Sequence, residues 1–407
     1  MSSKVQSSSR KVFQNRKILS RIFDFLDDNN IRNEFLPTSN KQILIYGQVQ
    51  SGKTAKIMEY IKNTNVKTKI LMIQNSLSML EQYERALNLN KIEFSSVSNS
   101  NISLVVHHTK RVDLNIVLLV MNNNYRRDAL DIILSRVKIS VYSLIMDESD
   151  LYYKNLTNNS LYKKANECVH ITATPFSSGY KAYFDEVIVI PPKKEYISFD
   201  KLDIKFIPEV KCENTTTMNI IKKDFLKAKQ GIMLITIHSR ILQMEKLCSY
   251  LAKQSLLLNV PIVMLSSKNT LYFNKKIKEL PRISISEVIS RLEDHKHIIF
   301  IANRLASRGV NYSDLTYSRH LTHQIIKKSE SKTNFIQRCR ILGNKEGVIE
   351  KLKLYCLNCD EDYFKILLQK IDRIEKDVNY LKLGYVSTDD IKSKPKPKTK
   401  LVRAKTM

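Results

Sequence analysis

The stretch that decides the fold is QILIYGQVQSGKTAKIMEYIK, residues 42–62. It opens with a short apolar run, passes through the loop from Gly47 to Thr54, and ends in a segment whose apolar residues have helical spacing. In the order strand, GxxxxGK[ST] loop and helix, backbone N–H groups and a helix N-terminus surround the phosphates of a nucleotide. We therefore expect an α/β domain with a phosphate-binding loop at residues 47–54.

The residue types in this loop fit ATP and Mg²⁺. The chain has only 8 glycines in 407 residues, and two of them stand here, where the backbone must approach a phosphate closely. The lysine of such a loop reaches the β- and γ-phosphates, and the hydroxyl after it binds Mg²⁺. We assign nucleotide binding to Gly47, Gln50, Ser51, Gly52, Lys53 and Thr54, with Lys53 also catalytic and Thr54 also a metal ligand.

An acidic cluster follows a second apolar run. VYSLIM, residues 141–146, leads directly into Asp147-Glu148-Ser149-Asp150. Open α/β sheets bind their ligands at the carboxyl ends of the strands, so this cluster should lie near the phosphate loop. We assign Asp147 to Mg²⁺ and Glu148 to activation of the attacking water. About 25 residues later, CVHIT is followed by the segment Thr172-Ala173-Thr174-Pro175.

Apolar runs alternate with helical patterns in both halves of the chain. This alternation indicates βα units and mainly parallel sheets. The rhythm breaks at Pro191-Pro192 and resumes near residue 231, which predicts two sheets joined by a linker. The further runs are 69–73, 116–121 and 168–172 in the first half, and 231–237, 261–266 and 297–303 in the second.

The order of these motifs resembles that of superfamily 2 helicases. The loop at 47–54, Asp147–Asp150 and Thr172–Pro175 resemble motifs I, II and III of that superfamily. In the second half, Arg308-Gly309 resembles motif V, and FIQRCRILG, residues 335–343, resembles motif VI.

The resemblance extends the set of site residues into the second half. It implies that Gly309 and Gln337 contribute to nucleotide binding and that either Arg338 or Arg340 acts as an arginine finger on the γ-phosphate. The sixth motif of the family usually spaces these residues more widely, so the choice between the two arginines stays open. The residues of these motifs look most similar to those of a subset of helicase-like ATPases. That subset is found in large DNA viruses and beside bacterial endonuclease modules.

The resemblance also implies the architecture. It is an α/β fold of two tandem RecA-like domains, parallel sheets flanked by helices, with a small helical C-terminal extension. We expect a basic N-terminal arm and helix at 1–35, an ATP-binding domain at 36–195, a second domain at 200–350, a helical extension at 351–390 and a disordered basic tail at 391–407. The extension could pack on the second domain or form a dimer seam.

The charge of the chain points to a polyanionic partner. The formal net charge is +27, and the five basic residues of 1–17 with the seven of 392–407 account for less than half of it. A basic body of this kind favours binding to a phosphate backbone. Apolar runs are too short to span a bilayer, so we expect an intracellular protein, in the host cytoplasm or virion if viral, that binds nucleic acid, with DNA favoured over RNA.

Loops after the strands supply candidate contacts with nucleic acid. They are Asn75, Ser76, Asn122–Asn124, Arg126, Arg127 and His238–Arg240. The six cysteines are scattered, and Cys356-x-x-Cys359 would need two further ligands to bind zinc.

Two functions remain open at this point. The first is an ATP-dependent helicase or translocase. The alternative is a non-unwinding ATPase subunit of a viral replication, transcription or packaging complex, with protein partners there.

Overall fold

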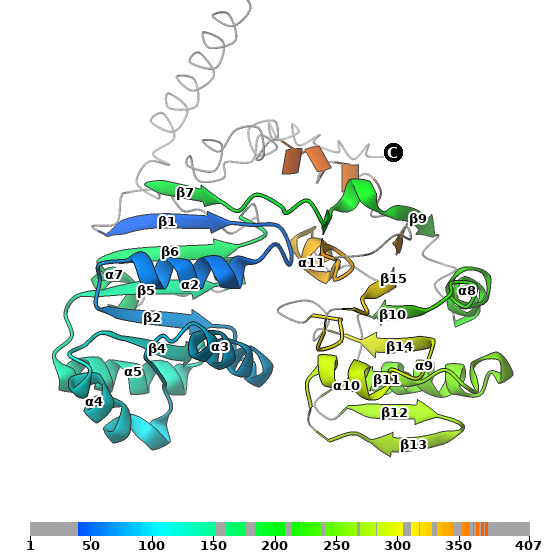
Figure 1. Ribbon diagram of the computed structural model, residues 1–407, viewed down its shortest axis with the longest axis horizontal. Coiled ribbons are helices and arrows are strands. Elements are labelled where there is room, and N and C mark those ends of the chain that lie inside the picture. Colours follow the sequence, from blue (N-terminus) through cyan, green and yellow to red (C-terminus); the bar gives the residue numbers. More distant parts are fainter. Residues whose placement is uncertain are drawn as a thin grey trace, which may run out of the picture.

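A computed structural model gives the structure of the protein, and its strands form two main sheets (Figure 1). The structure describes residues 40–151, 160–175, 184–207, 214–237, 241–266, 269–281, 283–303, 311–316, 318–327, 332–345 and 352–357, together with 361, 364–365, 368–369 and 371–372. The predicted N-terminal arm and helix and the basic tail lie outside these residues.

The described strands of the first half form a seven-stranded sheet in the order β3-β4-β2-β5-β6-β1-β7. Every neighbouring pair in it is parallel. The strands are β1 (Lys41–Tyr46), β2 (Thr68–Ile73), β3 (Phe94–Ser96), β4 (Ile116–Met121), β5 (Tyr142–Asp147), β6 (Glu167–Thr172) and β7 (Glu186–Val189).

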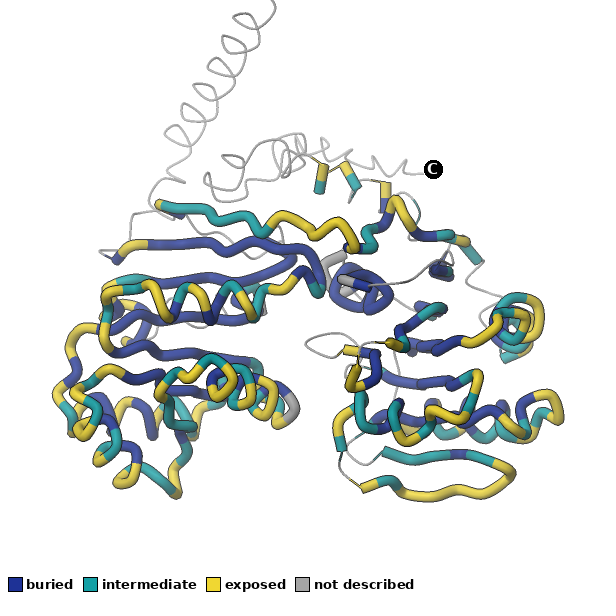
Figure 2. The backbone as a smooth tube through the Cα atoms, in the orientation of Figure 1, coloured by how far each residue is buried: buried dark blue, intermediate teal, exposed yellow. Residues whose placement is uncertain are grey.

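Helices cover both faces of this sheet, and its central strands β2 and β4 are buried along their whole length (Figure 2). Helices α2 (Lys53–Asn63) and α3 (Leu77–Leu89) pack on one face through residues such as Ile57 and Tyr83. Helices α4 (Ile102–Arg111), α5 (Asn124–Val137) and α7 (Ser160–Lys164) pack on the other.

The second half repeats this plan in an eight-stranded sheet of order β13-β12-β11-β14-β10-β15-β17-β9. Its strands are β9 (Asp203–Ile207), β10 (Gly231–Thr236), β11 (Ile262–Leu265), β12 (Thr270–Phe273), β13 (Lys276–Glu279), β14 (His297–Ala302), β15 (Leu321–Ile326) and β17 (Lys353–Leu357). Its helices are α8 (Asn214–Ile220), α9 (Ile241–Ala252), α10 (Ile285–Arg291) and α11 (Lys332–Arg338). The chain thus folds as two tandem RecA-like α/β domains, as the sequence predicted.

Two features of the second sheet depart from the sequence-based expectation. The pairs β11–β12 and β12–β13 are antiparallel, so a hairpin extends one edge of an otherwise parallel sheet. At the other edge, β17 pairs in parallel with both β15 and β9. Because β17 spans Lys353–Leu357, the second domain continues past residue 350, where we had expected the extension to begin.

The two domains meet at the carboxyl ends of their strands. In Figure 1 the arrowheads of β1 and β14 point toward each other, and α11 lies between the sheets. One apolar cluster runs across the junction, from Leu44 and Val49 in the first domain to Phe335 and Leu342 in the second. The link between the domains adds a two-stranded ribbon, in which β8 (Tyr196–Ile197) pairs antiparallel with β16 (Gly343–Asn344).

The described positions between 361 and 372 are helical. Phe364 packs edge-on against Phe199, with 5.1 Å between ring centroids, and against Phe335 at 6.3 Å. The start of the extension therefore packs on the core that the two domains share.

Candidate nucleotide site between the two domains

The loop between β1 and α2 has the backbone of an anion-binding site. Gln50 and Gly52 both adopt left-handed conformations, with φ of 58° and 94°. Such residues turn successive N–H groups toward one concavity. A side chain at Gly47 would collide with its surroundings, since its Cβ would lie 2.5 Å from Ser51 Oγ. This close packing explains why glycine stands at position 47.

Lys53 folds back over the loop that precedes it. Its Nζ donates to the carbonyl oxygens of Gly47 at 3.3 Å and Gln48 at 3.1 Å. Desolvation lowers the pKa of Lys53, while the nearby Glu148 and Asp147 oppose this shift. In this position the Lys53 amine can replace its hydrogen bonds to the two carbonyl oxygens with hydrogen bonds to phosphate oxygens.

The predicted acidic pair lies at the end of β5, buried against α3. Asp147 accepts hydrogen bonds from the Tyr83 hydroxyl at 2.8 Å and from the Glu148 N–H at 3.0 Å. Burial, followed by repulsion from Glu148, raises the pKa of Asp147 to about 7. A cation next to Asp147 would favour the ionised carboxylate and so oppose both causes, as expected of a metal ligand.

Tyr83 connects the two predicted metal ligands. Burial and the charge of Asp147 raise the pKa of its hydroxyl, while a hydrogen bond with Thr54 opposes the increase. The Tyr83 hydroxyl therefore bonds to Asp147 and also lies close enough to Thr54 for that side chain to affect its pKa. The oxygen atoms of Thr54 and Asp147 are the ligand type that Mg²⁺ prefers, so the residues present fit this ion.

A hydrogen-bond network joins the acidic cluster to the second domain. The hydroxyls of Thr172 and Thr174 donate to the two carboxylate oxygens of Asp150, at 2.8 and 2.9 Å. From α11, Gln337 Nε2 donates to Glu148 Oε2 at 3.1 Å and to Thr174 Oγ1 at 3.3 Å. The structure therefore brings together the residues of the predicted motifs II, III and VI.

Both predicted arginines are buried at the end of α11, with exposed fractions of 2% for Arg338 and 4% for Arg340. Desolvation lowers the pKa of Arg340, and the charge of Glu148 opposes that shift. The positive charge of Arg340 also acts on Lys53, whose pKa it lowers. The charge of Arg340 therefore acts on Glu148 of the acidic pair and on Lys53 of the phosphate loop.

The phosphate loop touches the second domain directly. Gly343 has a φ of 130°, and a Cβ there would lie 2.5 Å from Gln50 Oε1. The Tyr196 hydroxyl, on the linker strand β8, donates to the carbonyl oxygen of Val49 at 2.7 Å. Because β8 pairs with β16, the linker, the loop and the segment after the arginines form one continuous contact.

The structure describes only part of the remaining predictions. Arg308, Gly309 and the segment His238–Arg240 lie outside the described residues. Of the candidate nucleic-acid contacts, Asn75 accepts a hydrogen bond from Asn123 Nδ2 at 3.0 Å, which ties two neighbouring loops together. Arg126 donates to the carbonyl oxygen of Val97 at 2.6 Å, so its guanidinium already supports the protein backbone.

Sequence reasoning missed Tyr83, Tyr196 and Gln324, which contact the site or its supporting backbone. Tyr83 and Tyr196 sit in a helical pattern and a linker, where a tyrosine carries no signal of its own. Gln324 lies in LTHQII, where Thr322 and His323 are polar as well, so its position gave no clear signal either.

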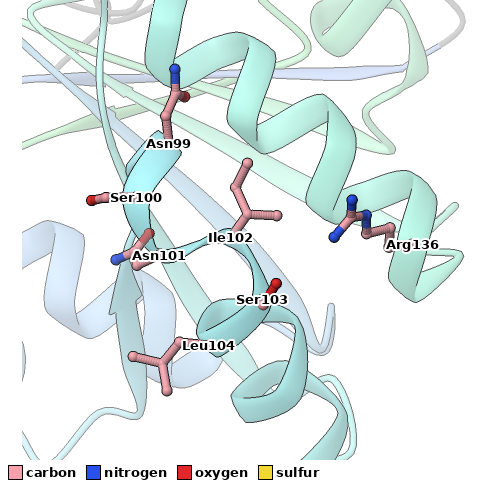
Figure 3. A pocket seen from close by; sticks show the side chains of 7 residues that line it. All are labelled: Asn99, Ser100, Asn101, Ile102, Ser103, Leu104 and Arg136. Carbon is pink, nitrogen blue, oxygen red and sulfur yellow. The ribbon is translucent and has the colours of Figure 1, made fainter.

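Other regions offer less chemistry. A surface pocket of about 490 Å³ lies at the start of α4 and against Arg136 of α5, and none of its residues was predicted to be functional (Figure 3). No three His, Cys, Asp or Glu side chains are grouped as a metal site within the described ranges, and Cys359 lies outside them. In that same part of the chain, helices are too short or too polar to cross a membrane.

Comparisons with known proteins match the chain only by structure. No protein-family model and no curated protein matches it. RecG bound to a three-way DNA junction is 12% identical, with a TM-score of 0.48, over 82% of this chain. Yeast (S. cerevisiae) Dbp5 bound to RNA and ADP BeF3 is 13% identical, with a TM-score of 0.46, over 81% of this chain and 82% of its own.

A DEAD box protein from Methanococcus jannaschii is 15% identical, with a TM-score of 0.42, over 84% of this chain and 94% of its own. The chain spans 42% of the length of the RecG chain. The assignment of a function therefore rests on the residues that meet between the two domains.

Proposed function

We propose that this chain is a nucleic-acid-stimulated ATPase of superfamily 2 that works as a helicase or translocase. The observation that carries the proposal is the hydrogen bond that Gln337, from the second domain, donates to Glu148 of the first, beside Arg340, whose charge acts on Glu148 and Lys53. When residues from two domains complete a phosphate site, the presence of the γ-phosphate determines whether the two domains close on each other. Opening and closing of the junction between the domains then drives movement along nucleic acid.

The proposed chemistry divides the site into four roles. Lys53 and the N–H groups of the phosphate loop bind the β- and γ-phosphates. Glu148 orients the attacking water and accepts its proton, and Gln337 holds the Glu148 carboxylate in place. Arg340 stabilises the negative charge that develops on the γ-phosphate oxygens. Thr54 and Asp147 would hold Mg²⁺, which supplies further stabilisation of phosphate charge when bound.

The hydrogen-bond network around Asp150 is the proposed link between ATP hydrolysis and the loops that hold nucleic acid. Thr172 and Thr174 are fixed by Asp150, and Thr174 also accepts from Gln337. Loss of the γ-phosphate removes the partner of Arg340 and so weakens the hold of α11 on the first domain. The loops at the carboxyl ends of β2 and β4, which Asn75 and Asn123 join, then move relative to the second domain.

Nucleic acid is the proposed track, with DNA favoured over RNA. The +27 net charge supports a phosphate backbone as the partner. A helicase would separate a tailed duplex, whereas the alternative, a non-unwinding ATPase subunit of a viral complex, would hydrolyse ATP without separating strands. Strand displacement on tailed DNA and RNA duplexes distinguishes the two.

The test of the proposed function is ATP turnover with and without single-stranded DNA, duplex DNA and RNA. Lys53→Ala should abolish turnover. Glu148→Gln keeps the shape of the side chain and should still bind ATP, while its kcat falls by about 10² to 10⁴ through loss of the base. If Lys53→Ala hydrolyses ATP as fast as the wild type, the proposed site is wrong.

A further inference from the structure

One buried amide in the second domain has an unusual position. Gln324 lies in the middle of β15, a central strand of the sheet, and its exposed fraction is 0%. A polar side chain costs free energy in such a place unless it makes hydrogen bonds. The groups to which Gln324 bonds therefore indicate what it does.

Gln324 binds both sides of the turn that carries Arg340. Its Oε1 accepts from the Ile341 N–H at 3.0 Å, and its Nε2 donates to the carbonyl oxygen of Arg338. Nε2 also lies 3.3 Å from the hydroxyl of Thr236, the last residue of β10. One side chain thus connects a central strand to the backbone just before and just after Arg340.

Backbone hydrogen bonds, such as that from the Leu342 N–H to the Cys339 carbonyl oxygen at 3.3 Å, form the turn itself, and Gln324 joins this turn to the sheet. Helix α11 ends at Arg338, and beyond it the Arg340 N–H turns back to the carbonyl oxygen of Arg338 at 2.7 Å. The end of a helix leaves carbonyl groups without intrahelical partners, and here the Arg338 carbonyl accepts from both the Arg340 N–H and the amide of Gln324. The same amide satisfies the N–H of Ile341, so the peptide groups around Arg340 are fixed from the β-sheet side.

We propose that Gln324 is a positioning residue, which holds the 338–341 turn so that Arg340 meets the γ-phosphate. The proposal rests on the proposed function, because it needs Arg340 to act on a triphosphate. A finger works only when its guanidinium is held in the productive geometry, and a misplacement of about 1 Å can cost about 10² in rate. The hydrogen bonds of Gln324 reach Thr236, Arg338 and Ile341, which belong to neither the nucleotide loop nor the acidic pair.

The experiment compares Gln324→Leu with a matched variant of the neighbouring residue, His323→Leu. His323 is also buried in β15 but belongs to the opposite face, where it packs on Phe225 with 5.3 Å between ring centroids. Gln324→Leu should lower kcat by about 10² and weaken binding of ADP with aluminium fluoride by the same factor, while leaving binding of ADP unchanged. His323→Leu should change thermal stability without changing kcat.

A double-mutant cycle separates positioning from general damage. In an Arg340→Ala background, Gln324→Leu should cause no further fall in single-turnover hydrolysis, since the group it positions is gone. A further fall of about 10² in that background would overturn the proposal. If Gln324→Leu does not fold, Gln324→Glu, which keeps the acceptor for Ile341 and loses the donor to Arg338, is measured by the same criteria.

The outcomes distinguish this inference from the proposed function. If Lys53→Ala and Arg340→Ala lose hydrolysis but Gln324→Leu turns over like the wild type, only the positioning role is wrong. If Lys53→Ala hydrolyses normally, the proposed function itself fails.

Discussion

Buried charge is the residue-level property that defines the junction of the two domains. Lys53 and Arg340 are cations whose pKa values burial lowers, and Asp147 is an acid whose pKa burial raises. In each case burial therefore disfavours the charged form of the side chain. The phosphates of a nucleotide carry the charge opposite to Lys53 and Arg340, and a divalent cation carries the charge opposite to Asp147. We therefore propose a triphosphate with a divalent cation as the ligand of this site.

We propose Arg340 as the finger, because its charge acts on both Glu148 and Lys53. We predict that Arg340→Ala lowers kcat by about 10³ or more, as removal of a finger does in related phosphoryl transfer, with ADP affinity retained. Arg338→Ala should mainly lower the free energy of unfolding. Steady-state turnover and nucleotide titrations check both variants, and the reverse pattern would reassign the finger to Arg338.

At the scale of elements, a buried polar network joins β1, which leads into the phosphate loop, to the neighbouring strand β6. His170 of β6 lies 2.8 Å from Gln42 Oε1 of β1, and the Tyr162 hydroxyl donates to the same oxygen at 2.6 Å. Burial lowers the pKa of His170 to about 3. These bonds link the two parallel strands that lead into the phosphate loop and into Thr172.

This network predicts an acid-sensitive first domain. Between pH 6.5 and about 3 an unfolded His170 binds a proton that the folded chain does not bind. The free energy of unfolding should therefore fall as pH decreases below 6.5, by about 1.4 kcal/mol per pH unit from this residue, and the loss should be absent above that pH. His170→Gln should show the shallower pH dependence in denaturant unfolding at pH 7.5 and 5.5. Equal slopes for both proteins would contradict the role of His170.

The contact between Gly343 and the phosphate loop gives a second element-scale prediction. At φ 130° an added Cβ meets Gln50 Oε1 at 2.5 Å, so Gly343→Ala should strain β16 and push it away from the loop. A non-glycine residue in such a conformation costs of order 1–3 kcal/mol. We expect a lower kcat together with a lower unfolding free energy. Wild-type turnover in Gly343→Ala would show that this contact is not needed for the closed site.

Sequence patterns predicted some elements well and others not at all, for physical reasons. Strands such as β2 and β4 are buried on both faces, so their sequences are continuous apolar runs that stand out. The edge strand β13, Lys276–Glu279, is exposed at every residue and carries no apolar pattern. Strand β17 and the 338–341 turn depend on partners far away in sequence, and Gln324 gains its meaning only from them.

At the scale of the whole molecule, two similar sheets face each other through their carboxyl ends, and one apolar cluster crosses between them. The motifs of both halves were placed in the sequence by their order and by a family resemblance. Their meeting at Glu148 and Gln337 could not be derived from spacing, because it depends on how two separately folded sheets pack. The basic charge of the chain belongs to this scale too.

The net charge predicts how the whole molecule binds nucleic acid. Affinity for duplex DNA should fall linearly with the logarithm of salt concentration, with a slope of about −0.9 for each phosphate contacted. Lys53→Ala should keep that slope, since it changes nucleotide binding and not the outer surface. Fluorescence anisotropy with labelled DNA over a salt series measures it, and a salt-independent affinity would rule out phosphate contacts as its main source.

A crystal structure with ADP and aluminium fluoride bound tests most directly the claim that both domains complete one phosphate site. We predict that the fluoride contacts Lys53 from the first domain and Arg340 from the second, with Gln337 still bonded to Glu148. A fluoride held by residues of the first domain alone, with Arg340 turned away from it, would contradict the account.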